Sequence, residues 1–141
     1  MPTIFTRIID GELPGRFVWR DDHCVAFLSI NPLQPGHTLV VPILEIDHWI
    51  DLPPAVNERL MHVSHLIGRA QQQAFQPERI GLIIAGFEVP HAHVHVLPIQ
   101  GMGDFDFRNA AATVDGDVQD GIAATLRSTL RAHGHDEFVV D

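Results

Sequence analysis

Histidine recurs at every second position in the stretch Pro90-His91-Ala92-His93-Val94-His95-Val96-Leu97-Pro98. Successive side chains of an extended strand point to opposite faces, so this spacing predicts three imidazoles on one face of a strand. Histidine is only a moderate strand former, and neighbouring imidazoles repel one another when more than one is protonated. The stretch therefore indicates a chemical role.

Three roles fit such a row of histidines. An exposed polar face on an edge strand would have no chemical role. Histidines at alternate strand positions are also a good geometry for binding zinc or iron. In the third role, a neutral imidazole attacks phosphorus or a carbonyl carbon while a second imidazole handles the proton. The spacing alone leaves the last two roles open.

Three other stretches accompany the histidines in order along the chain: residues 4–14 (IFTRIIDGELP), 21–28 (DDHCVAFL) and 30–42 (INPLQPGHTLVVP). Together with the histidine stretch, they make residues 3 to about 100 resemble the histidine triad (HIT) superfamily of nucleotide hydrolases and transferases. The resemblance implies an α+β, HIT-like fold. It also implies a homodimer in which two five-stranded sheets join edge to edge, which would cover unpaired strand edges.

The same resemblance implies roles for four histidines and one asparagine. His93 matches the nucleophile, which forms a covalent nucleotidyl-histidine that water later hydrolyses, and His95 is expected to contact the phosphate and assist the leaving group. His91 matches the supporting first histidine of the triad. His37 matches a fourth histidine that fixes the tautomer and orientation of the active imidazoles. Asn31 is expected to shape the wall of the pocket.

The chain departs from the family pattern at the N-terminus. Many bacterial relatives carry two cysteines there that bind structural zinc together with histidines. The corresponding positions are Thr3 and Thr6, whose hydroxyls are poor zinc ligands. We therefore expect no metal and no other cofactor.

Two further departures concern the substrate. Ser29 stands where the family usually has an aspartate for the ribose hydroxyls, and Phe87 stands where glutamine is common. Backbone amides near Glu88 and Val89 are expected to compensate for the missing phosphate donors. Ser29, Phe87, Glu88 and Val89 are accordingly the predicted substrate-binding residues, together with Asn31.

Periodicity and turn residues predict one sheet and two helices. Strands are expected over residues 16–20, 24–28, 37–41, 80–85 and 91–97, in an antiparallel arrangement. A long amphipathic helix is expected from residues 51–54 to about 75, and a C-terminal helix over 122–131. His62 and His65 lie three residues apart on the long helix and are interpreted as part of a solvated helix face, with a metal clip as the alternative.

The chain is predicted to consist of a HIT domain over residues 1–100 and a C-terminal extension over 101–141 that packs on or near it. Residues 101–120 are rich in Gly, Asp and Ala, so we expect a loop that buries little and is mobile or packs on a partner subunit. Residues 104–107 are interpreted as a surface loop, with a pocket rim as the alternative.

Composition narrows the class of protein. The chain has 141 residues, of which 45% are hydrophobic, as expected for one globular domain. Its formal net charge of -9 opposes binding to bulk nucleic acid or to an anionic membrane. The single cysteine, Cys24, lies in an apolar run, which fits a core residue in a reducing compartment. No secretory signal or membrane-spanning stretch is evident, so we expect a cytoplasmic protein.

These observations support one leading function and two alternatives. The leading one is a hydrolase or transferase that acts on the α-phosphate of a small nucleotide, taken to be a purine nucleotide, in a phosphoramidate or phosphoanhydride. The first alternative is a nucleotide-binding module with weak or no catalysis, because Ser29 and Phe87 replace family contacts. The second is a metal-dependent barrel enzyme that uses the histidine strand.

Overall fold

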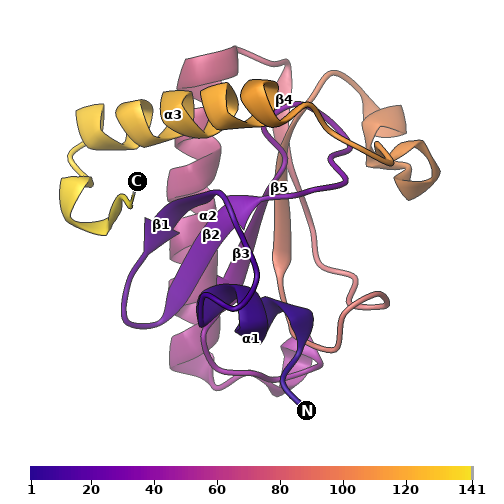
Figure 1. Ribbon diagram of the computed structural model, residues 1–141, viewed down its shortest axis with the longest axis vertical. Helices are drawn as coiled ribbons and strands as arrows, with labels where there is room; N and C mark the ends of the chain where they lie inside the picture. Colours follow the sequence, from indigo (N-terminus) through magenta and orange to yellow (C-terminus); the bar gives the residue numbers. More distant parts are fainter. Residues whose placement is uncertain (141) are drawn as a thin grey trace.

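Five strands form a single antiparallel sheet in the order β1-β2-β3-β5-β4 (Figure 1). The computed structural model describes residues 1–140. The strands are β1 (Phe17–Arg20), β2 (Cys24–Leu28), β3 (Thr38–Pro42), β4 (Arg79–Ile83) and β5 (Val94–Ile99). The predicted α+β class and five-stranded antiparallel sheet are confirmed.

Helices cover both faces of the sheet. The long helix α2 (Pro54–Phe75) lies behind the sheet in Figure 1, and the short helix α1 (Ile4–Ile9) lies in front of it. Strand β2 shows why both faces are buried. Ala26 points into the core beneath α2, whereas Val25 and Phe27 pack with Phe5 of α1. Side chains that alternate along one strand therefore serve two separate hydrophobic clusters.

The C-terminal helix α3 (Gly116–Ala132) lies across one end of the sheet in Figure 1. It is longer than predicted because Asp115 caps it, with a carboxylate that accepts the backbone N–H groups of Asp117 and Val118. Leu126 and Leu130 of α3 are fully buried in the same cluster as α2. The division of the chain at residue 100 stays a prediction.

Residues 101–112 bury more than the sequence suggested. They contain the short 3-10 helices Met102–Phe105 and Phe107–Asn109. Phe105 and Phe107 pack with Leu97 and Ile99 of β5. The expectation that this segment has little to bury is therefore wrong, because its aromatic side chains find an apolar surface at the end of the sheet.

The histidine strand begins later than predicted. Its first residue is Val94, so His91 and His93 precede it. The backbone N–H of His91 bonds to the carbonyl of Val89, and the N–H of Ala92 bonds to the carbonyl of Ile46. These amides are thus used in a turn and a loop contact instead of the sheet ladder. Elsewhere, Cys24 is buried as predicted, and none of the helices within residues 1–140 combines the length and apolar character that crossing a membrane requires.

Candidate active site

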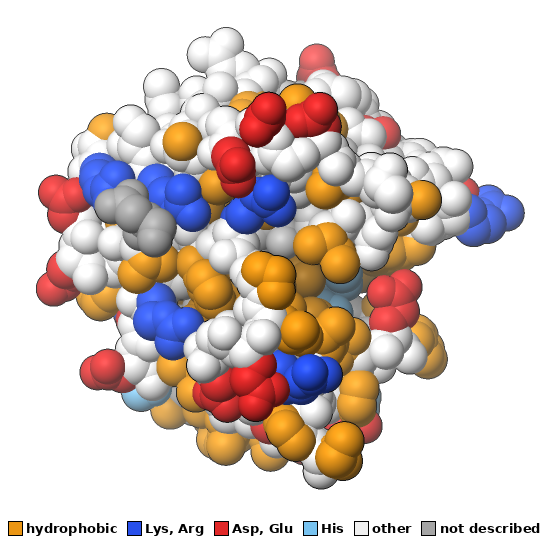
Figure 2. All heavy atoms as spheres, in the orientation of Figure 1, with side chains coloured by type: hydrophobic (Ala, Val, Ile, Leu, Met, Phe, Trp, Pro, Cys, Tyr) orange, Lys and Arg blue, Asp and Glu red, His pale blue; other side chains and the backbone are white. Residues whose placement is uncertain are grey.

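A cavity of about 660 Å³ opens beside the histidines. His37, His93 and His95 line it, each 2–7% exposed. Most of the other lining side chains are apolar and come from α1, from the end of β2 and from the segment after Asp106. Figure 2 shows a histidine at the bottom of a hollow whose walls are hydrophobic. The site therefore combines a few polar groups with a large apolar surface, as small-molecule sites usually do.

The contacts of His37 determine how its proton and that of His95 are placed. Nδ1 of His37 accepts the backbone N–H of Leu33 at 3.0 Å, so in the neutral ring the proton lies on Nε2. This Nε2 lies 2.9 Å from Nδ1 of His95 and donates to it. The remaining proton of His95 must then lie on Nε2. His95 therefore offers an N–H donor to the cavity that it lines.

His93 has the opposite tautomer. Its Nδ1 lies 2.7 Å from the carbonyl oxygen of His91, which can only accept, so the proton of the neutral ring lies on Nδ1. Nε2 then carries a free lone pair. The His93 and His95 rings meet at 4.8 Å between centroids. An unprotonated nitrogen and an N–H donor are thus adjacent in one cavity.

His91 does not line the cavity. Its Nε2 donates to the carbonyl of Pro42 at 2.7 Å, and its Nδ1 lies 2.7 Å from the hydroxyl of Thr3. Two of the three alternating imidazoles, those of His93 and His95, therefore line the cavity, whereas His91 lies against Thr3, its ring edge-on to Phe5 as that of His93 is. Its contribution to the site is the carbonyl that orients His93.

The buried imidazoles are neutral at pH 7. Burial, followed by the nearby charge of His93, lowers the pKa of His37 to about 4. Burial, followed by the charges of His93 and His37, lowers the pKa of His95 to about 3. Burial also lowers the pKa of His91 and of His93, although their carbonyl partners act in the opposite direction. The neutral form of His93, with its lone pair on Nε2, is thus the resting form.

A protein-family model described as the HIT domain matches residues 10–102. The chain belongs to the HIT family. It is 34% identical over 106 residues to Protein hit of Bacillus subtilis, covering 72% of this chain and 73% of that protein. It is also 32% identical over 100 residues to an adenylylsulfatase of Arabidopsis thaliana, covering 67% of this chain and 51% of that one.

A solved structure shares the HIT fold. The crystal structure of a Hit-like protein involved in cell-cycle regulation from Bartonella henselae superposes with a TM-score of 0.80. The two chains are 26% identical, and the match covers 90% of this chain and 95% of that one. The predicted family and fold are thereby confirmed, including the long helix α2 and the C-terminal helix α3.

Four of the five predicted substrate-binding residues line the cavity of this HIT domain: Ser29, Asn31, Glu88 and Val89. Asn31 joins two segments of the cavity wall, because its side-chain amide donates to the carbonyls of Ala111 and Ala112 at 2.9 and 3.3 Å. The fifth, Phe87, is 96% exposed and does not line the cavity. The loop turns at Gly86, just before Phe87, where φ is +87°.

Sequence reasoning missed two walls of the site. Phe5 of α1 lies edge-on to the His93 ring at 4.9 Å, and Phe107 lies edge-on to the His95 ring at 5.1 Å. Phe107 was interpreted as part of a surface loop, yet it lines the cavity, so the pocket-rim alternative describes it better. The sequence offered one signal for this wall, the two aromatic residues Phe105 and Phe107 that follow the histidine strand.

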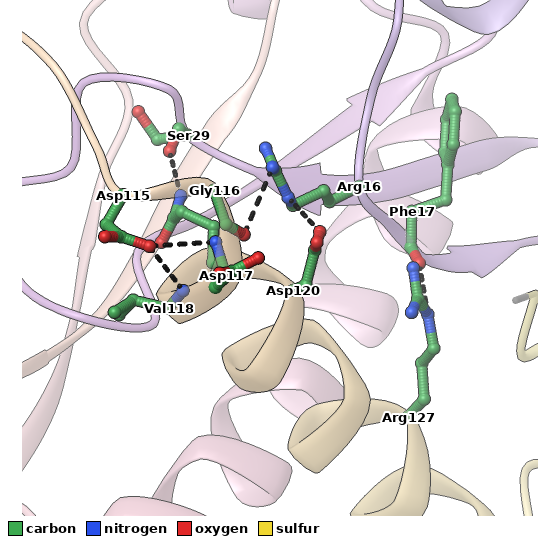
Figure 3. Close-up of polar contacts among 10 residues, drawn as sticks. Arg16, Phe17, Ser29, Asp115, Gly116, Asp117, Val118, Asp120 and Arg127 are labelled. Atoms are coloured by element: carbon green, nitrogen blue, oxygen red, sulfur yellow. Dashed lines mark hydrogen bonds and ion pairs between the residues drawn. The ribbon is translucent and has the colours of Figure 1, made fainter.

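Helix α3 is bonded to residues beside the cavity. Figure 3 shows contacts from α3 to the start of β1 and to Ser29, just after β2. The side-chain amide of Gln119 donates to the carbonyl of Ser29 at 3.1 Å, and Arg16 pairs with Asp120 at 2.7 Å. Arg127 further along donates to the carbonyl of Phe17 at 2.8 Å. The position of Ser29 therefore depends on a helix almost a hundred residues later in the chain.

The N-terminal threonines do not fit a zinc ion. Thr3 bonds to His91, and Thr6 donates its hydroxyl to Glu45 at 2.7 Å. Neutral hydroxyls lack the charge and softness of the thiolates that bind structural zinc. In the part of the chain that the structure describes, no three side chains of His, Cys, Asp or Glu gather as a metal site would require.

Proposed function

We propose that this HIT protein is a nucleotide hydrolase or nucleotidyltransferase in which His93 attacks the α-phosphorus. One observation carries the proposal: the carbonyl of His91 holds the proton of His93 on Nδ1, which leaves Nε2 unprotonated beside the N–H donor of His95. A preset tautomer removes the need for proton transfer before the attack.

The reaction then has two steps. Nε2 of His93 forms a bond to the α-phosphorus while the bond to the leaving group breaks, and the electron pair departs with the leaving group. The Nδ1–H group shares the positive charge of the nucleotidyl-imidazolium with the His91 carbonyl, while the N–H of His95 donates a hydrogen bond to the departing atom. Sulfate leaves as the dianion, whereas the nitrogen of a phosphoramidate takes up a proton from solvent and leaves as the neutral amine. Water then attacks phosphorus and breaks the Nε2–P bond. One of its protons stays on the released nucleoside monophosphate and the other passes to solvent.

The charge of the cavity favours a substrate with a short phosphate group. Among residues 1–140, the lining contains one formally charged side chain at neutral pH, the carboxylate of Glu88, and no arginine. A polyphosphate chain would meet no cation there and would be repelled by a protein of net charge -9. A nucleoside monophosphate joined to a small leaving group fits better, and the relative that is an adenylylsulfatase acts on a substrate of this kind.

Trapping of the covalent intermediate tests the proposal. The protein is mixed with adenylyl sulfate or adenosine 5′-phosphoramidate labelled at the α-phosphorus and quenched in alkali, in which phosphohistidine-type bonds survive. We expect label on the wild-type protein that acid removes, and none on His93→Gln. His65→Gln is the matched control, since His65 lies exposed on α2.

Two results would contradict catalysis by His93. Label that persists in His93→Gln would assign the nucleophile elsewhere. Saturable nucleotide binding without label or product would instead support the alternative function, a binding module that has lost turnover.

We also propose that two copies pair through β4, as the family resemblance implies. β4 is an edge strand, and Leu82 and Ile84 are 41% and 37% exposed on or beside it. An uncovered edge with apolar side chains is a template for a second strand. Sedimentation of the wild-type protein is expected to give a dimer and that of Leu82→Lys a monomer. Val118→Lys, at a 59% exposed apolar site on α3, should leave the dimer intact.

A further inference from the structure

A buried glutamine joins the two strands that carry the histidine pair. Gln71 of α2 has no exposed surface, and its amide nitrogen lies 2.9 Å from the carbonyl of Gly36 and 2.9 Å from the carbonyl of Val96. These carbonyls belong to the residue before His37 and the residue after His95. One amide group thus contacts the backbone next to both members of the His37–His95 hydrogen bond.

The contact occurs where the sheet ladder ends. Between β3 and β5, the last residue pair on this side joins Thr38 to Val96, so His37 lies one residue beyond the ladder. Gly36 adopts a φ of +93°, which turns its backbone out of the extended conformation. The two hydrogens of the Gln71 amide therefore link the strands at a place where backbone pairing does not.

The other end of the Gln71 side chain shows that this arrangement is costly. Within residues 1–140, Oε1 of Gln71 is the one buried side-chain nitrogen or oxygen atom without a hydrogen-bond partner. Exchanging the amide oxygen and nitrogen would not help, because the oxygen would then face two carbonyls. A buried acceptor without a partner opposes folding, so the two bonds that the amide donates to Gly36 and Val96 are made at that cost.

We propose that Gln71 is a positioning residue that keeps His37 and His95 in hydrogen-bond register across β3 and β5. The His37–His95 bond fixes the tautomer of His95, so loss of register would let His95 present a bare nitrogen to the cavity in place of its N–H donor. The catalytic consequence rests on the proposed function, whereas the effect on the tautomer does not.

The test compares Gln71→Met with Ser64→Ala. Ser64 is equally buried on α2, but its hydroxyl bonds within the helix, to the carbonyl of Leu60, so Ser64→Ala removes a buried hydrogen bond without touching the strands. Nitrogen-15 NMR of the imidazoles reads the tautomer of His95 directly. We expect Gln71→Met to shift the His95 resonances toward a mixture of tautomers and to lower kcat about tenfold with little change in KM, whereas Ser64→Ala changes neither.

The outcomes separate this proposal from the proposed function. Unchanged His95 resonances in folded Gln71→Met would overturn the positioning role whether or not the protein turns over any nucleotide. If Gln71→Met does not fold, Gln71→Glu takes its place, because a protonated carboxyl keeps the shape and one donor. Its His95 resonances should then change as the carboxyl ionises, and constant resonances across that titration would equally refute the role. A wild-type protein that forms no nucleotidyl-histidine would refute the proposed function and leave the NMR result valid.

Discussion

Mild acid should destabilise this fold through its buried histidines. The pKa of an ordinary histidine is 6.5, whereas burial lowers the pKa of His37 to about 4 and that of His95 to about 3. Below pH 6.5 the unfolded chain therefore binds protons that the folded chain does not. Stability is complete above pH 6.5 and falls as the pH drops toward the folded pKa values.

The size of the effect follows from the same values. At pH 5.5, one unit below the unfolded pKa, each of the two imidazoles contributes about 1.4 kcal/mol to unfolding, or about 3 kcal/mol together. The lowered pKa values of His91 and His93 act in the same direction. The lowered carboxylate pKa of Asp21 takes effect below its ordinary value of 3.8 and so lies outside this range.

Urea unfolding at pH 7.5 and pH 5.5 measures the loss, with Trp19 fluorescence as the signal because Trp19 is fully buried. The wild-type free energy of unfolding should fall by about 3 kcal/mol or more between the two pH values. In His95→Asn the difference should shrink by about 1.4 kcal/mol, since one proton-binding group is gone. Equal stability at both pH values, or an unchanged difference in His95→Asn, would refute the reasoning.

Three other substitutions test the surroundings of the site. Thr3→Val removes the hydroxyl partner of His91 and should lower the free energy of unfolding by about 1 kcal/mol in urea titrations, whereas Thr3→Ser should not. Phe87→Ala should leave stability within about 0.5 kcal/mol and nucleotide labelling at the wild-type level, because the side chain is 96% exposed; reduced labelling would restore Phe87 to the site. Gly36→Ala should cost about 2 kcal/mol, measured in the same way, because φ is +93° and the new Cβ would lie 2.9 Å from Phe75. An unchanged free energy of unfolding in Gly36→Ala would mean that the turn accommodates the new side chain without strain.

Local patterns predicted most of the elements and much of the histidine chemistry. The three- and four-residue spacing of Leu60, Val63 and Ile67 marks the buried side of α2, and Pro53 and Pro54 mark its start. Proline at a helix start needs no tertiary partner, since the first backbone amides of a helix lack acceptors in any case. The resemblance of four stretches to the HIT family also predicted that His37 would lie beside the histidine strand.

Contacts within the turn before β5 were not predictable from spacing. Alternation predicted a common face for His91, His93 and His95, but it holds only while the backbone stays extended. The amides of His91 and Ala92 bond to Val89 and Ile46, and the strand begins three residues later than predicted, at Val94. The spacing identified the residues that matter and misjudged which of them reach the cavity.

The sequence by itself determined the five strands, the helices α2 and α3 and their order, because periodicity and turn residues act over a few neighbours; the resemblance to the HIT family singled out the four histidines, and helix α1 was not predicted. The tertiary structure alone decided which nitrogen of each imidazole carries the proton. The deciding partners are the Leu33 amide for His37, the His91 carbonyl for His93, the His37 ring for His95 and the Pro42 carbonyl for His91. A tautomer depends on one hydrogen-bond partner within about 3 Å. The partners of His95 and His91 come from segments 58 and 49 residues away, and those of His93 and His37 from turns that the tertiary structure holds in place.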